Sequence, residues 1–168
     1  MANIVTISDF EGSFQIQSDT RTTARFNLVR DEYQNEFIYT MMGAELGALF
    51  LADLDGSGVP QTAIYLSLYN AFQEDTDFGA LVRSRGIKEA VKAYVWFFFA
   101  RNNNHLITTS GNTVKRSENA DVSIDPFYLA QNFNKAIETA HAIQWYINEN
   151  LSDYPTYNGQ ELEYMIGI

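Results

Sequence analysis

Apolar residues recur at helical spacing in several stretches of the chain, and the stretch 86–111 is the most apolar of them. Five of its apolar residues lie three or four positions apart, which is the spacing of one helix face: Ala90, Val91, Tyr94, Val95 and Phe98. Residues 93–100 are apolar on nearly every side, and a helix of that kind must be covered all round. We therefore predict a central helix over 86–103, about 27 Å long at 1.5 Å per residue, with the rest of the chain packed around it.

The pattern also predicts a long first helix that begins at Asp19 or Thr20 and ends at Met42. Asp and Thr are favoured caps, and Gly43 is a natural stop for a helix. Its apolar face consists of Phe26, Val29, Tyr33, Phe37, Ile38 and Met41. Arg30 falls on the opposite, polar side.

Three further helices are predicted. The second covers 44–54, and its expected buried face is Leu46, Leu49 and Phe50. The third covers 60–72 and begins with a proline, which suits the first helical position. The last covers 125–150 and opens with an Asp-Pro pair, a strong start signal. Between the third and the central helix, the pattern predicts a polar connector and then a turn or short helix over 77–85.

The remaining segments complete the predicted fold. Residues 106–109 and 113–115 flank a Ser-Gly-Asn turn, which indicates a β-hairpin or an ordered loop. Residues 1–18 are expected to form an extended N-terminal arm, and 151–168 a C-terminal tail whose apolar end docks on its own core or on a neighbour. The prediction is thus a mainly α, single-domain bundle of four to five helices (19–150) with a projecting loop over 106–120 and two terminal arms.

Composition narrows the class of protein. The 168 residues suit one domain, and the absence of cysteine leaves no disulfide or thiolate metal site. No apolar run approaches the roughly 20 residues of a membrane span, so we expect a soluble protein with no membrane partner. The net charge of -10 argues against a domain that binds nucleic acid through Lys and Arg. Residues 60–115 are nevertheless mildly basic, with six bases against four acids, and both flanking segments are acidic. These charges suit either a solvated surface or faces that attract neighbouring subunits.

One stretch resembles a calcium-binding loop. Asp53, Asp55 and Ser57, followed by Gly58, match the opening of an EF-hand loop. Position 12 of that loop, which should supply a bidentate carboxylate, is Ile64. A calcium-responsive binding module using 53–58 is therefore a minor alternative to a plain Asp-Gly turn.

Catalytic motifs are missing from the sequence. His105 and His141 belong to no metal-binding pattern, and the phosphate-binding and nucleophile-elbow motifs do not occur. The carboxylate pairs lie in charged surroundings where nothing raises one pKa for acid catalysis. We predict a non-enzymatic protein without a cofactor.

Three stretches together resemble the head-tail connector (adaptor) proteins of tailed bacteriophages. They are YTMMGAELGALFL, the central GIKEAVKAYVWFFFARNNNHLITTSGNTVKRSENA, and DPFYLAQNFNKAIETAHAIQWYIN. The likeness covers roughly residues 20–150 and is a likeness of residue class. It implies a virion structural protein at the neck or portal vertex, assembled in the bacterial host cytoplasm.

The resemblance also implies partners. Connectors of this kind form a homo-oligomeric ring of about twelve subunits between the portal protein and the tail or neck proteins, closed by a head-to-tail interface. Genomic DNA passes through the lumen without being read, and an acidic lumen would let it slide. A tail-completion or other neck protein is the alternative within the same class.

The candidate contact residues follow from this resemblance and from the exposed ends. Cations on the central helix and at the loop tip are expected to meet a neighbour, together with the apolar and aromatic tail. The set is Lys88, Lys92, Thr113, Lys115, Arg116, Tyr154, Tyr157, Tyr164, Met165 and Ile166.

Overall fold

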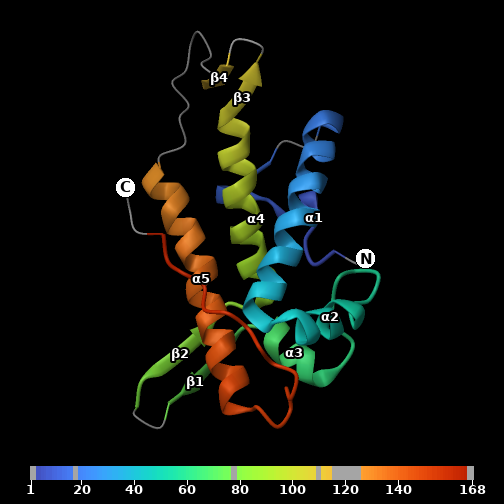
Figure 1. Cartoon of the computed structure of the whole chain (residues 1–168), viewed down its shortest axis with the longest axis vertical. Coiled ribbons are helices and arrows are strands. Elements are labelled where there is room, and N and C mark those ends of the chain that lie inside the picture. The colour runs from blue at the N-terminus through green and yellow to red at the C-terminus, as the bar shows by residue number, and fades with distance from the viewer. Residues whose placement is uncertain (1–2, 17–18, 77–78, 109–110, 115–125, 166–168) are drawn as a thin grey trace.

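The computed structural model describes residues 3–16, 19–76, 79–108, 111–114 and 126–165. These residues form a mainly helical fold with two small hairpins, which confirms the predicted fold class (Figure 1). The helices are α1 (Thr20–Met42), α2 (Ala44–Ala52), α3 (Ala63–Tyr69), α4 (Ile87–Asn104) and α5 (Pro126–Glu149). The strands are β1 (Phe72–Asp75), β2 (Leu81–Ser84), β3 (His105–Thr108) and β4 (Gly111–Val114). In the part of the chain described, no helix is both long enough and apolar enough to cross a membrane.

Helix α4 is the axis of the fold, as the sequence predicted. It lies between α1 and α5 and packs against both (Figure 1). Ile87, Val91 and Val95 are fully buried, and within 93–100 only Phe98 is partly exposed. The aromatic run of α4 is therefore core: Phe99 meets Phe26 of α1 edge to face, with ring centroids 5.8 Å apart.

Helix α1 has the predicted ends. The Asp19 carboxylate accepts hydrogen bonds from the main-chain N–H groups of Arg21 and Thr22, each at 3.0 Å. Gly43 ends the helix with a φ of 85°, which is favourable only for glycine. The prediction for Arg30 was wrong, because this side chain is 8% exposed. Its guanidinium bonds Asp31 at 2.7 Å, so its charge is compensated next to the core.

Helices α2 and α3 are shorter than predicted. Leu49, expected on the buried face of α2, is 48% exposed. Helix α3 begins at Ala63 rather than at Pro60, because the Asp53 carboxylate binds the main-chain N–H groups of Gln61 and Thr62 and holds them outside the helix. Pro60 instead forms a bridge with Leu54.

A second hairpin, β1–β2, replaces the predicted connector and turn over 74–85. Its register pairs Phe72 with Ser84 and Asp75 with Leu81. A main-chain hydrogen bond from Thr76 N to the oxygen of Ala80, 2.7 Å long, closes the turn. Four-residue strands are too short for a period-2 pattern to stand out, which explains why the sequence did not reveal them. The hairpin packs on α5 (Figure 1).

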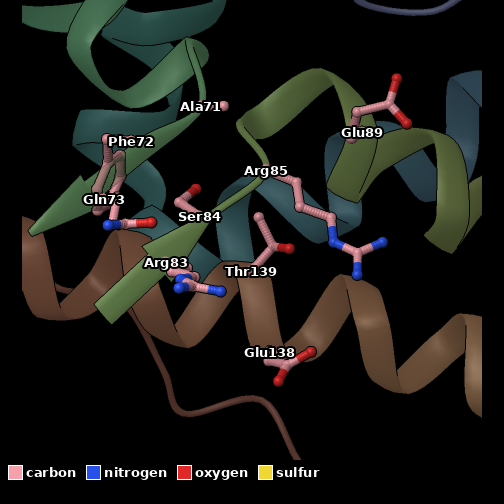
Figure 2. Close-up of a pocket in the computed structure, with 9 residues that line it drawn as sticks. All are labelled: Ala71, Phe72, Gln73, Arg83, Ser84, Arg85, Glu89, Glu138 and Thr139. Atoms are coloured by element: carbon pink, nitrogen blue, oxygen red, sulfur yellow. The ribbon is translucent and has the colours of Figure 1, made fainter. Parts of the chain in front are cut away.

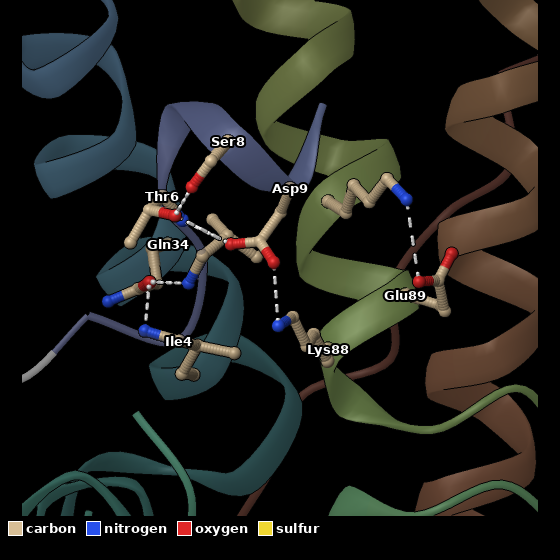
Figure 3. Close-up of polar contacts among 9 residues, drawn as sticks. Ile4, Thr6, Ser8, Asp9, Gln34, Lys88 and Glu89 are labelled. Carbon is tan, nitrogen blue, oxygen red and sulfur yellow. Dashed lines mark hydrogen bonds and ion pairs between the residues drawn. The ribbon is translucent and has the colours of Figure 1, made fainter. Parts of the chain in front are cut away.

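The N-terminal segment does not extend away from the bundle. Its two 3₁₀ turns, Ile7–Asp9 and Gly12–Phe14, lie along α1 and α4, and Ile4 and Phe10 are buried. The Gln34 side-chain oxygen accepts hydrogen bonds from Ile4 N at 2.9 Å and from Val5 N at 3.4 Å (Figure 3). A buried polar side chain of α1 therefore recognises the main chain of this segment.

The C-terminal tail also folds back on its own core. The Gln144 amide donates to the main-chain oxygens of Met41 and Gln160, at 3.0 and 2.7 Å, and so joins α5, α1 and the tail. At the crossing with α1 the tail has Gly159, where a Cβ would collide with the main-chain oxygen of Met41. Leu162 adds a buried apolar contact.

Candidate assembly interface

The two predicted contact lysines of α4 are engaged within the chain. Lys88 Nζ lies 2.7 Å from Asp9 Oδ1, and Lys92 Nζ lies 3.5 Å from Glu89 Oε1 (Figure 3). Lys92 also lies 5.5 Å from the centroid of the Phe14 ring. Both lysines therefore lie beside the N-terminal segment, and the Lys88 side chain is 37% exposed.

The ion pair between Asp9 and Lys88 shifts the pKa values of both side chains. The hydrogen bond with Asp9 raises the pKa of Lys88 above its ordinary value, against the opposing effect of partial burial. Burial alone would raise the pKa of Asp9, but the hydrogen bonds from Lys88 and Thr6 outweigh it and lower that pKa. The pair holds the turn Ile7–Asp9 on α4.

One predicted contact residue after the central helix lies in hairpin β3–β4. Thr113 belongs to β4 and pairs with Leu106 of β3. Lys115 and Arg116 lie outside the described residues. The hairpin continues α4 beyond the nearby ends of α1 and α5 (Figure 1). Its position agrees with the predicted projecting loop.

Two tail tyrosines lie on their own subunit. Tyr154 is 2% exposed, and its hydroxyl donates to the main-chain oxygen of Ile64 at 2.8 Å. Burial raises the pKa of Tyr154, and the nearby Tyr146 and Asp153 act in the same direction. Tyr157 is partly buried, and burial raises its pKa too. Tyr154 is thus a core residue of this chain.

The end of the described tail is more open. Tyr164 is 48% exposed and packs its ring edge to face on His141, with centroids 5.0 Å apart. His141 also contacts the main-chain oxygen of Leu162 at 2.7 Å. The Asn134 amide binds the main-chain N–H and oxygen of Met165, at 2.8 and 3.0 Å. Ile166 lies outside the described residues.

The carboxylates of the 53–58 loop accept hydrogen bonds from the loop and from the residues just before α3. The Asp53 carboxylate binds the main-chain N–H and the hydroxyl of Thr62, at 2.8 and 2.6 Å. Asp55 Oδ1 accepts from Ser57 N and Val59 N, at 2.8 and 3.0 Å. The described residues include no group of three or more His, Cys, Asp or Glu side chains placed to hold a metal ion. The hydroxyl of Thr62 and the loop amides lower the pKa of Asp53.

Hairpin β1–β2 and α5 enclose two grooves that sequence reasoning missed. The larger one, about 870 Å³ in volume, lies beside the middle of α5, and we call it the arginine groove (Figure 2). It is lined by Ala71, Phe72, Gln73, Arg83, Ser84, Arg85, Glu89, Glu138 and Thr139. The other, about 400 Å³, lies beside the C-terminal end of α5, and we call it the acidic groove. It is lined by Glu74, Asp75, Thr76, Ala80, Trp145, Glu149 and Asn150.

The sequence held one signal for these grooves. The mildly basic middle of the chain includes Arg83 and Arg85, and the acids Glu74 and Asp75 precede them closely. Strand pairing brings Glu74 and Asp75 of β1 beside the strand that carries Arg83 and is followed by Arg85. This hairpin was not predicted.

Comparison of the chain with protein-family models, with curated proteins and with solved structures finds no match.

Proposed function

We propose that this protein is a non-enzymatic virion structural protein, a head-tail connector that forms an oligomeric ring between the portal and the tail. The observation that carries the proposal is where the three connector-like stretches lie. They form the last turn of α1 with most of α2, then α4 with hairpin β3–β4, and then α5, and they include the packed pair α4 and α5. The likeness therefore follows the packed core and its projecting hairpin.

The projecting hairpin supports the same proposal. Strands β3 and β4 pair only with each other, so within the part of the chain that the structure describes no further strand covers either outer edge. Such an edge readily accepts another chain. In a ring, the hairpin of one subunit would meet the next subunit or the portal.

The charge of the chain suits a DNA channel. A net charge of -10 repels phosphates, so DNA would pass along the lumen without being held. The protein would act in the virion neck, and in the host cytoplasm while particles assemble.

Purified virions and the isolated protein test the proposal together. We expect mass spectrometry to detect the chain in virions, and negative-stain microscopy of the concentrated protein to show closed rings of about twelve subunits. A chain that is absent from virions and monomeric at every concentration would contradict the proposal.

A further inference from the structure

Hairpin β1–β2 contributes acids to the lining of one groove and arginines to the lining of the other. The acids Glu74 and Asp75 of β1 line the acidic groove, together with Glu149 of α5. Arg83 of β2 and Arg85, just after that strand, line the arginine groove. Figure 2 shows these two arginines on the hairpin side of the groove, with Glu138 on α5.

These charged side chains form no ion pairs within the described part of the chain. The ion pairs found there join Arg30 to Asp31, Lys88 to Asp9 and Lys92 to Glu89. Neither hairpin arginine has an ion-pair partner among the described residues, and neither have the acids of the acidic groove. The five charged residues concerned are all exposed: Glu74, Asp75, Arg83, Arg85 and Glu149.

The acidic groove also offers apolar surface. Trp145 lines it and is partly buried, and Leu81, the cross-strand partner of Asp75, is 42% exposed. Tryptophan is enriched among the residues that contribute most to protein–protein binding. The groove thus has the mixed apolar and charged character of a contact surface.

We propose that the acidic groove of one copy docks on the arginine groove of a second copy, head to tail. The arginines at positions 83 and 85 would then pair with the acids at positions 74 and 75 of the neighbour. When each copy uses its two grooves for two different neighbours, the interface is heterologous and closes into a ring if the rotation per subunit allows. If two copies instead fill each other's grooves, the contact is isologous and ends at a dimer. This inference rests on the proposed ring and names the surface that builds it.

The arrangement favours a second copy over a polyanion such as DNA. Glu138 and Glu89 also line the arginine groove, on α5 and α4, and Glu89 is compensated by Lys92. A phosphate chain filling the groove would meet Glu138, whereas a folded hairpin can place its acids against the arginine side alone. The acidic groove can supply such carboxylates, because Glu74 and Asp75 lie on strand β1.

Charge reversal in two variants tests this contact. R83E/R85E leaves a chain with two acidic patches, and E74K/D75K leaves a chain with two basic patches. We expect each variant alone to raise the protein concentration needed for assembly about tenfold or more, because like charges then face each other. Mixed in equal amounts, the two variants are expected to assemble again, since each acidic patch meets a basic one.

The control is R21E/R25E on α1, which changes the net charge as much as R83E/R85E does and is expected to leave assembly unchanged. Circular dichroism and melting temperature verify that every variant folds. If a reversal variant fails to fold, R83Q/R85Q and E74Q/D75Q replace the pair, with weaker assembly expected for each.

The outcomes separate this inference from the proposed function. Wild-type rings together with unchanged assembly of both folded variants would overturn the hairpin contact and leave the ring. Loss of assembly in each variant without recovery in the mixture would also overturn the pairing. A wild-type chain that never assembles would overturn both the ring and the contact.

Discussion

At the residue scale, a few buried polar side chains decide how the ends of the chain are placed. Gln34 binds the main chain of the N-terminal segment, and Gln144 binds the main chains of α1 and the tail. Both amides are at most 9% exposed, so a missing partner would leave a buried polar group unsatisfied. An apolar pattern does not show which main-chain groups such an amide will meet. The packing of both ends was therefore not predictable from the sequence.

The Asp9–Lys88 pair makes stability depend on pH. We expect Asp9→Asn to lower the free energy of unfolding by about 0.5–1 kcal/mol at pH 7, a small loss because both side chains are partly exposed to solvent. The folded state lowers the pKa of Asp9 below its ordinary 3.8, so the stabilisation is complete above that value and is lost as pH falls through the folded pKa.

Urea unfolding at pH 7 and pH 3 measures this difference. Lys88→Met is the matched variant and should cost about as much at pH 7. An Asp9→Asn effect of equal size at both pH values would show that the carboxylate charge is not what stabilises the turn.

Phe26 tests the core of the bundle. It is fully buried and meets Phe10 and Phe99 edge to face, with centroids 4.9 and 5.8 Å away. We expect Phe26→Ala to cost about 3–5 kcal/mol. Leu28, two positions further along α1, is 73% exposed, and Leu28→Ala should change stability by about 0.5 kcal/mol or less. Similar losses in denaturant unfolding for both variants would argue against this packing.

At the scale of elements, the sequence predicted the long helices well and the short elements poorly. Helices α1, α4 and α5 have sustained apolar faces and clear end signals such as Asp19 and Gly43, and their bounds agree with the prediction within one or two residues. The start of α3 was misplaced because the Asp53 carboxylate, a long-range partner, captures the amides before it. Hairpin β1–β2 was missed because tertiary packing on α5, rather than a local pattern, supports it.

The crossing of the tail over α1 depends on a glycine. A Cβ at position 159 would collide with the main-chain oxygen of Met41, and main chain cannot move as a flexible side chain does. We expect Gly159→Ala to destabilise the protein by about 1–3 kcal/mol. Gly56→Ala is the control, because a Cβ there meets nothing within 4 Å.

Hydrogen exchange locates this effect. In Gly159→Ala, the main-chain N–H of Gln160, which donates to the oxygen of Thr40 at 2.7 Å, should exchange faster than in the wild type. Unchanged exchange and stability would mean that the tail does not need this close approach.

A deletion in hairpin β3–β4 tests whether the hairpin serves assembly rather than folding of the helical core. Deleting residues 108–119 removes the end of β3 and all of β4 and leaves the packed faces of α1, α4 and α5 intact. We expect a folded chain whose assembly is weaker than that of the wild type. Thermal unfolding checks folding and sedimentation checks assembly. Normal assembly of the shortened chain would show that the hairpin is not a contact element.

At the scale of the whole molecule, the candidate site followed from the sequence only in outline. The projecting loop after the central helix was expected and is present as β3–β4. Lys88, Lys92 and Tyr154, expected at contacts with neighbours, have contacts within their own chain. The acids of β1 and the arginines at the end of β2 come together through strand pairing, and no local pattern in these residues revealed that pairing. Among the described residues, we therefore place the proposed contacts on the two hairpins and on the grooves beside β1–β2.

The number of copies in the assembled particle tests the central claim most directly. Native mass spectrometry over a series of protein concentrations counts them. We expect a closed species of about twelve subunits that grows at the expense of the monomer, with few open intermediates. A monomer at every concentration, or an open series of oligomers without a closed end point, would contradict it.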